Sequence, residues 1–147
     1  MSYEPKVMVC NVRGLNDRAR RTGVKSVADT TGASIVCLQE TKLVVVTHSI
    51  VMESLGADFD DYFCLPATDT RGGIIVAWKS RVVQLDSAHV DTNSVTMKVT
   101  PLGGAPGWWL TCVYGPQRML TRSPSLQSYV PLGPPDRAYG PFVGNLT

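Results

Sequence analysis

The chain has 147 residues, of which 44% are hydrophobic and 18% are charged, and its formal net charge at pH 7 is +2. This amount of apolar material can build the core of one ordinary domain, which excludes a wholly disordered chain. The small net charge does not by itself indicate nucleic-acid binding, and no apolar run approaches the roughly 20 residues of a membrane-spanning helix.

The cysteines and the N-terminal residues bear on the cellular compartment. The four cysteines form no CxxC pair, so a zinc site is a poor interpretation. Three of them lie inside apolar runs, and we expect buried thiols in a reducing compartment; the four are Cys10, Cys37, Cys64 and Cys112. The stretch MSYEPKVMVC carries charge and a proline where a secretion signal has its apolar core. We therefore expect an intracellular protein, nuclear or cytoplasmic.

The first predicted elements are a strand and a helix. Residues 6–12, KVMVCNV, form a short apolar run rich in valine, which is typical of a strand. A helix is predicted over about residues 17–30, with Asn16 or Asp17 as its N-terminal cap and Gly32 as its C-terminal cap. This pair of elements begins an alternating strand and helix pattern.

A second strand is predicted over residues 34–38, SIVCL, and the segment after it is ambiguous. Residues 43–55 contain a β-branched run that favours a strand, but the spacing of their apolar residues also fits one face of a helix. We predict a helix that begins at about Thr47 and is stopped by Gly56.

Short strands separated by turns are predicted through the middle of the chain. The stretch VTMKV alternates with period two, as in a half-buried antiparallel strand, whereas GGIIVAW is a continuous apolar run that suggests burial on both faces. The predicted strands cover residues 62–65, 73–78, 81–85, 94–99 and 108–114. The order of elements indicates an α/β fold with a mixed, mainly antiparallel sheet and flanking helices.

The composition shifts near residue 115. Six of the ten prolines lie after that position, and neither a helical nor a strand period is visible there. Because proline interrupts both helices and sheet ladders, we expect residues 118–147 to form an irregular tail behind a domain of residues 1–117.

Polar side chains stand at the ends of three predicted apolar strands. Glu40 follows the second strand, Asn11 closes the first, and Tyr114 closes the last. A carboxylate fixed at a rigid strand end is a natural ligand for a hard divalent cation such as Mg²⁺. Each residue also has a plainer interpretation: a solvated loop carboxylate, a turn asparagine and a core tyrosine with a wet hydroxyl.

Four segments together resemble a known family. NVRGLND (residues 11–17), IVCLQETK (35–42), TRGGIIVAW (70–78) and WLTCVYGP (109–116) are similar to successive blocks of the endonuclease/exonuclease/phosphatase superfamily. More narrowly, they resemble the N-terminal part of the endonuclease domain of LINE-type (non-LTR) retrotransposons, especially the plant form. The resemblance runs from about residue 7 to residue 117.

The resemblance implies a four-layer α/β-sandwich that cleaves DNA phosphodiester bonds with Mg²⁺. It places Asn11 in the network that holds the phosphate and the metal, Glu40 as the Mg²⁺ ligand, and Tyr114 as a phosphate contact. Arg71 lies in a loop that approaches DNA in relatives, and Arg13 is a further candidate contact to nucleic acid.

The family's later blocks are not found in this sequence. Neither a GDFN-like strand end nor a Ser-Asp-His block follows residue 117, and His48 and His89 do not stand where they could replace the catalytic histidine. We therefore expect a truncated and nearly inactive domain, since loss of a general base alone costs roughly 10²- to 10⁴-fold. We also expect a single sheet with an uncovered inner face that includes Trp78, Trp108 and Trp109.

Two other interpretations stay open. The predicted first helix carries Arg18, Arg20, Arg21 and Lys25, which could make the chain a residual nucleic-acid-binding module or could simply be a solvated face. The chain could also be a fragment of a phosphoinositide phosphatase or phosphodiesterase branch of the same superfamily. The sequence leaves the oligomeric state open.

Overall fold

The computed structural model describes residues 5–68, 72–91 and 94–113, and the backbone of three short segments after them. The helices are α1 (Arg18–Thr31) and α2 (His48–Leu55). The strands are β1 (Val7–Asn11), β2 (Ile35–Gln39), β3 (Asp61–Leu65), β4 (Ile74–Trp78), β5 (Val83–Val90), β6 (Ser94–Pro101), β7 (Trp108–Val113), β8 (Met119–Ser123), β9 (Val130–Pro131) and β10 (Phe142–Gly144). Neither helix in this part of the chain is long and apolar enough to cross a membrane.

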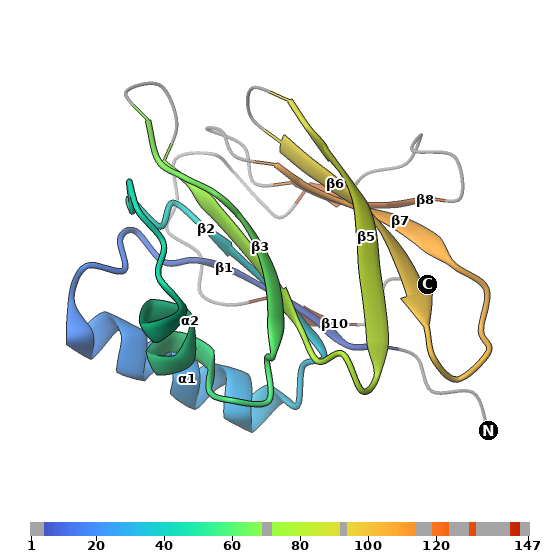
Figure 1. Cartoon of the computed structure of the whole chain (residues 1–147), viewed down its shortest axis with the longest axis horizontal. Helices are drawn as coiled ribbons and strands as arrows, with labels where there is room; N and C mark the ends of the chain where they lie inside the picture. The colour runs from blue at the N-terminus through green and yellow to red at the C-terminus, as the bar shows by residue number, and fades with distance from the viewer. Residues whose placement is uncertain are drawn as a thin grey trace.

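The strands form two sheets that pack face to face. The first sheet has the order β10-β1-β2-β4-β3, and the second has the order β5-β6-β7-β8-β9. In the first sheet β1 and β2 are parallel and joined through α1, whereas β4 runs antiparallel to both β2 and β3. Figure 1 shows α1 and α2 on one side of the first sheet and the second sheet on its other side.

Both helices have a capping residue at each end. The Asp17 side chain accepts a hydrogen bond from the Ala19 backbone N–H at 2.8 Å, and Gly32 ends α1 in the left-handed conformation. Thr47 caps α2, and the N–H of Gly56 donates to the Met52 carbonyl at 2.8 Å. The sequence therefore predicted both helices to within about one residue at each end.

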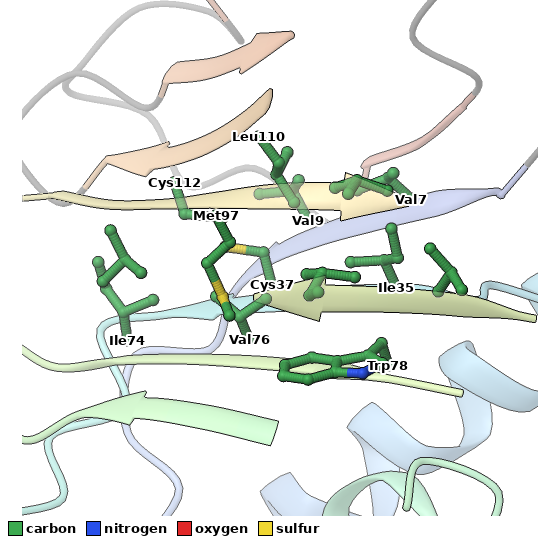
Figure 2. Close-up of a cluster of buried hydrophobic side chains, with 14 of the residues drawn as sticks. Val7, Val9, Ile35, Cys37, Ile74, Val76, Trp78, Met97, Leu110 and Cys112 are labelled. Carbon is green, nitrogen blue, oxygen red and sulfur yellow. The ribbon is translucent and has the colours of Figure 1, made fainter. Parts of the chain in front are cut away.

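Strand alternation in the first sheet supplies two separate cores. In β1, Val7 and Val9 face the second sheet, whereas Met8 and Cys10 face the helices. β4 is likewise buried on both faces, as its continuous apolar sequence predicted. Figure 2 shows the core between the sheets, to which β2, β4, β6 and β7 all contribute side chains.

The expectation of a single sheet with an uncovered inner face was wrong. Trp78 is 3% exposed and Trp108 is 5% exposed, and both lie in the core between the two sheets. Trp109, the next residue of β7, lies on the opposite face of the second sheet from Trp108. There the Lys98 ammonium lies 5.3 Å from the Trp109 ring centroid. The alternating stretch VTMKV in β6 predicted a one-sided strand, but counting strands could not show that they divide into two sheets that cover each other.

The expected irregular tail also differs from the structure. β8 and β9 extend the second sheet, and β10 pairs with β1 at the edge of the first. Proline still constrains these strands: β8 and β10 contain none, and Pro131 lies in β9, which is an edge strand, the position in a sheet that tolerates proline. The domain boundary at residue 117 stays a prediction.

The cysteines are reduced and mostly buried, as the sequence predicted. Cys10, Cys37 and Cys112 are buried, Cys64 is half-buried, and none of the four is in a disulfide. Burial, and next the hydrogen bond with Cys112, raises the pKa of the Cys37 thiol well above its usual range. The Cys37 thiol is therefore a packing group of low reactivity.

Candidate functional site at the carboxyl ends of β1 and β2

The carboxyl ends of the parallel strands β1 and β2 meet at one edge of the first sheet. Asn11 pairs with Gln39 in the ladder, and Glu40 follows directly. Backbone bonding continues past the strands, because the N–H of Gly14 donates to the Glu40 carbonyl at 2.7 Å and that of Leu15 to the Thr41 carbonyl at 2.9 Å. We call residues 11–16 and 39–43 the rim.

The rim contains unusual backbone conformations. Arg13 (φ 53°), Glu40 (φ 56°) and Lys42 (φ 57°) are the three non-glycine residues with positive φ among the described residues. A left-handed conformation costs a residue with a Cβ on the order of 1 kcal/mol. Such residues persist only where surrounding bonds impose the conformation, and they concentrate at functional sites.

Glu40 and Asn11 carry the side-chain oxygens of the rim that the sequence predicted as cation ligands. The Glu40 side chain is half-buried and forms no ion pair with a described residue, and the Asn11 amide oxygen accepts the Arg13 N–H at 3.2 Å. The described residues contain no group of three or more His, Cys, Asp or Glu side chains that could hold a metal. One carboxylate and one amide oxygen do fit Mg²⁺, because that ion commonly keeps several waters and uses one or two protein carboxylates.

Arg21 of α1 binds the backbone of the rim. Its Nε donates to the Leu15 carbonyl at 2.7 Å and its Nη2 to the Asn16 carbonyl at 3.1 Å, while Nη1 donates to Glu53 of α2 at 2.9 Å. Arg20 adds a bond of 2.8 Å to the Val12 carbonyl. These two guanidinium groups therefore fix the shape of the rim.

The basic residues of α1 thus have a role that the sequence did not predict. The hypothesis of a phosphate-binding face treated Arg18, Arg20 and Arg21 alike, but Arg20 and Arg21 bind rim carbonyls, whereas the Arg18 side chain is 86% exposed. Lys25 forms an ion pair with Asp29 one helical turn further on, at 3.1 Å. The sequence did contain a signal for this anchoring role. Arg20 and Arg21 lie about one turn after the helix cap, from where a long side chain can reach back to the carbonyls of the preceding loop.

Gln39 links the rim to the second sheet. It is 2% exposed, and its Nε2 donates to the carbonyl of Val113, the last residue of β7, at 2.9 Å. Its Oε1 is buried without a partner among the described residues. Sequence reasoning noted Gln39 only as part of a motif, although a polar residue that ends an otherwise apolar strand was visible.

The Gly72-Gly73 pair packs against the Thr41-Lys42 part of the rim. The N–H of Thr41 donates to the Gly73 carbonyl at 3.3 Å, and that of Lys42 donates to the Gly72 carbonyl at 2.6 Å. Gly73 has φ 90°, and a Cβ there would lie 2.5 Å from the Thr41 hydroxyl oxygen. Glycine is therefore required at residue 73 for both conformation and space.

The structure brings together Asn11, Arg13 and Glu40 of the sequence-predicted site. Tyr114 and Arg71 lie outside the described residues, although their chain neighbours Val113 and Gly72 both bond to the rim. The two histidines lie elsewhere. His48 stacks on Tyr62, with ring centroids 6.3 Å apart, and the exposed His89 lies beside Asp91. The roles of the predicted site residues stay predictions.

Comparisons with known proteins agree with this architecture. The sequence matches no protein-family model and no curated protein. Among solved structures, the AP endonuclease LMAP from Leishmania major superposes with a TM-score of 0.52 at 18% sequence identity. The fold is that of the endonuclease/exonuclease/phosphatase proteins. The superposition covers 75% of this chain and 40% of the Leishmania chain, so this chain spans less than half of that protein's length.

Proposed function

We propose that this chain is the N-terminal part of a Mg²⁺-dependent DNA endonuclease domain of the LINE-type retrotransposon kind, in its plant form. In this proposal the rim binds a divalent cation and a DNA phosphate. Glu40 is the cation ligand, Asn11 supports the cation and the phosphate, and Tyr114 donates to the phosphate. Arg13 and Arg71 contact the DNA backbone, and the protein resides in the nucleus or cytoplasm.

The observation that carries the proposal is the strained rim. The left-handed residues of the described chain gather where a carboxylate and an amide leave neighbouring parallel strands. The same edge is where the sequence motifs resemble metal and phosphate ligands, and the AP endonuclease likeness supports the same fold. Stability alone does not require this arrangement, since strain of this kind opposes folding.

The side chains of the rim are suited to phosphodiester chemistry. A bound Mg²⁺ would stabilise the negative charge that develops on the phosphate and on the leaving oxygen. Glu40 would hold that ion with an anionic oxygen on a rigid strand end, and the Asn11 amide would bind the same group without adding charge. The Arg13 guanidinium can approach a second phosphate oxygen because it is exposed beside Asn11.

We further propose that these 147 residues alone turn over substrate very slowly. They contain neither the GDFN-like block nor the Ser-Asp-His block that supply the water-orienting pair and the general base in the family the sequence resembles. Loss of a base typically costs 10²- to 10⁴-fold, and other losses add to it. Binding by the basic face of α1 is not favoured as a second function, because Arg20 and Arg21 bind rim carbonyls instead.

Cation binding tests the proposal. Mn²⁺ affinity, measured by electron paramagnetic resonance, should fall about tenfold or more in Glu40→Gln, as expected when a metal ligand is lost. Asp29→Asn is the matched control, because it removes a surface carboxylate far along α1. Equal Mn²⁺ affinity in Glu40→Gln and the natural protein would refute the proposed site. Robust Mg²⁺-dependent nicking of supercoiled plasmid that is lost in Glu40→Gln would refute only the proposed inactivity.

A further inference from the structure

An exposed apolar loop follows the rim. Val44 is 72% exposed and Val45 is 69% exposed, which makes them the most exposed of the large hydrophobic residues in the described chain. Isolated apolar residues are common on protein surfaces, whereas these two are adjacent in the chain and directly follow the rim. We call residues 43–46 the valine loop.

The valine loop is held at both ends. Leu43 is buried, and its carbonyl accepts the Ala67 N–H at 2.8 Å. At the other end, the Thr47 hydroxyl accepts the Ile50 N–H at 3.3 Å and begins α2. The two valines therefore project from a fixed loop, so little conformational entropy is lost when a ligand contacts them.

Two cations of the rim have no ion-pair partner in the described chain, and one of them, Lys42, directly precedes the valine loop. Arg13 and Lys42 are exposed, and no described carboxylate pairs with either of them. The aliphatic stem of Lys42 crosses Gly14, since a Cβ built at Gly14 would lie 3.8 Å from the Lys42 Cδ. The Lys42 side chain is therefore directed back over the loop that carries Arg13.

We propose that the valine loop and these two cations form a binding surface for one nucleic-acid strand. The inference rests on the proposed function, because the strand would be the one whose phosphate reaches Glu40. Phosphates would lie on Arg13 and Lys42, and the apolar face of an adjacent sugar and base would pack on Val44 and Val45. A nucleic-acid strand presents both chemistries, charged phosphates and apolar faces of sugars and bases, and apolar side chains beside phosphate contacts can support an unstacked base.

Salt-dependent binding separates the apolar and ionic parts of this surface. The probe is a fluorescein-labelled single-stranded oligodeoxynucleotide of about 20 residues with its duplex as the second arm, long enough to cover several phosphates. Val44→Thr/Val45→Thr keeps side-chain shape but adds two hydroxyls, and it should weaken binding about tenfold at every salt concentration. The slope of log affinity against log salt should not change in this variant, because no charge is lost.

Matched variants complete the test. Lys42→Gln should reduce the salt slope by about one. Leu102→Thr changes an exposed apolar residue beyond the far end of β6, and it should bind as the natural protein does. Both valines are exposed, so their variant should fold, which circular dichroism can verify.

The outcomes also separate this inference from the proposed cation site. Unchanged oligonucleotide affinity in the double valine variant, or no binding by the natural protein at low salt, would overturn the surface. In either case Mn²⁺ binding that still depends on Glu40 would leave the cation site standing. Stronger binding to single strands than to duplex would support contact with an unstacked base, and an equal loss in the Leu102→Thr control would count against the valines.

Discussion

The two edges of the first sheet are built in opposite ways. At the rim, three non-glycine residues are left-handed and the Glu40 carboxylate has no ionic partner in the described chain. At the other edge, where β4 ends, no described non-glycine residue has positive φ, and Asp60 accepts hydrogen bonds from both the backbone N–H and the hydroxyl of Ser80. Where β4 ends, the Asp60 carboxylate is hydrogen-bonded within its own turn, whereas the rim holds strained residues around a carboxylate without an ion-pair partner. This is the expected difference between a structural turn and a binding site.

The largest expected effect comes from closing the space behind the rim. In Gly73→Ala the new methyl would meet the Thr41 hydroxyl at 2.5 Å and the Ala67 nitrogen at 3.1 Å, at a residue with φ 90°. We expect a loss of about 3 kcal/mol or more in the free energy of unfolding, from overpacking and backbone strain together. Urea denaturation measures this loss.

A glycine of the same conformation provides the control for that prediction. Gly104 also has φ 90°, but nothing lies within 4 Å of a Cβ built there. Gly104→Ala should therefore cost only the conformational part, about 1 kcal/mol. Equal losses in the two variants would mean that the rim is no more tightly packed than an open turn.

The next largest effect should distinguish two arginines that share one carboxylate. Arg21→Met removes three hydrogen bonds, to Leu15, Asn16 and Glu53, and should cost about 2 to 3 kcal/mol because these bonds involve a charged, mostly buried donor. Arg18→Met removes an exposed contact of 3.6 Å to Glu53 and should cost less than about 0.5 kcal/mol.

Amide hydrogen exchange would show which part of the rim loosens when Arg21 is replaced. Hydrogen exchange at the Gly14 and Leu15 amides should accelerate in Arg21→Met and not in Arg18→Met, because only Arg21 holds this part of the rim. If the two variants had the same stability and the same exchange, Arg21 would not be fixing the rim.

Local sequence signals predicted the elements but not their partners. The caps predicted for α1 were Asn16 or Asp17 and Gly32, and α2 was predicted from about Thr47 to Gly56, because such signals depend on residues close in the chain. The sequence placed Asn11 and Glu40 at strand ends, and the family resemblance implied a joint role for them. The parallel pairing of β1 and β2 that brings them to one edge comes from the structure. The covering of one sheet by the other, and the use of Arg21 as a backbone anchor, depend on contacts between distant residues that no local pattern encodes.

A third prediction concerns the link between the rim and the second sheet. Gln39→Leu removes the 2.9 Å bond to the Val113 carbonyl, but it also removes a buried oxygen that has no described partner. The two effects oppose each other, so the net loss in unfolding free energy should be only about 1 kcal/mol. Gln39→Glu should cost more than Gln39→Leu at neutral pH, because it places a charge in a buried position beside a carbonyl oxygen. Urea denaturation of both variants would contradict this account if the glutamate variant were the more stable.

The smallest effect should come from the Asp60 turn, at the edge where β4 ends, and it should depend on pH. Hydrogen bonds from the Ser80 hydroxyl and then the Ser80 N–H lower the pKa of Asp60 below its ordinary value. A lowered folded-state pKa stabilises the protein above the unfolded value of about 3.9, and this contribution is lost as the pH falls through the folded-state pKa. Because Asp60 is exposed, Asp60→Asn should cost no more than about 1 kcal/mol at pH 6, and the difference from the natural protein should shrink below about pH 4. Urea denaturation midpoints at several pH values measure this stability difference, and Asp58→Asn in the same turn is the control. If the difference between Asp60→Asn and the natural protein grew on acidification, the Ser80 bonds would not favour the ionised carboxylate.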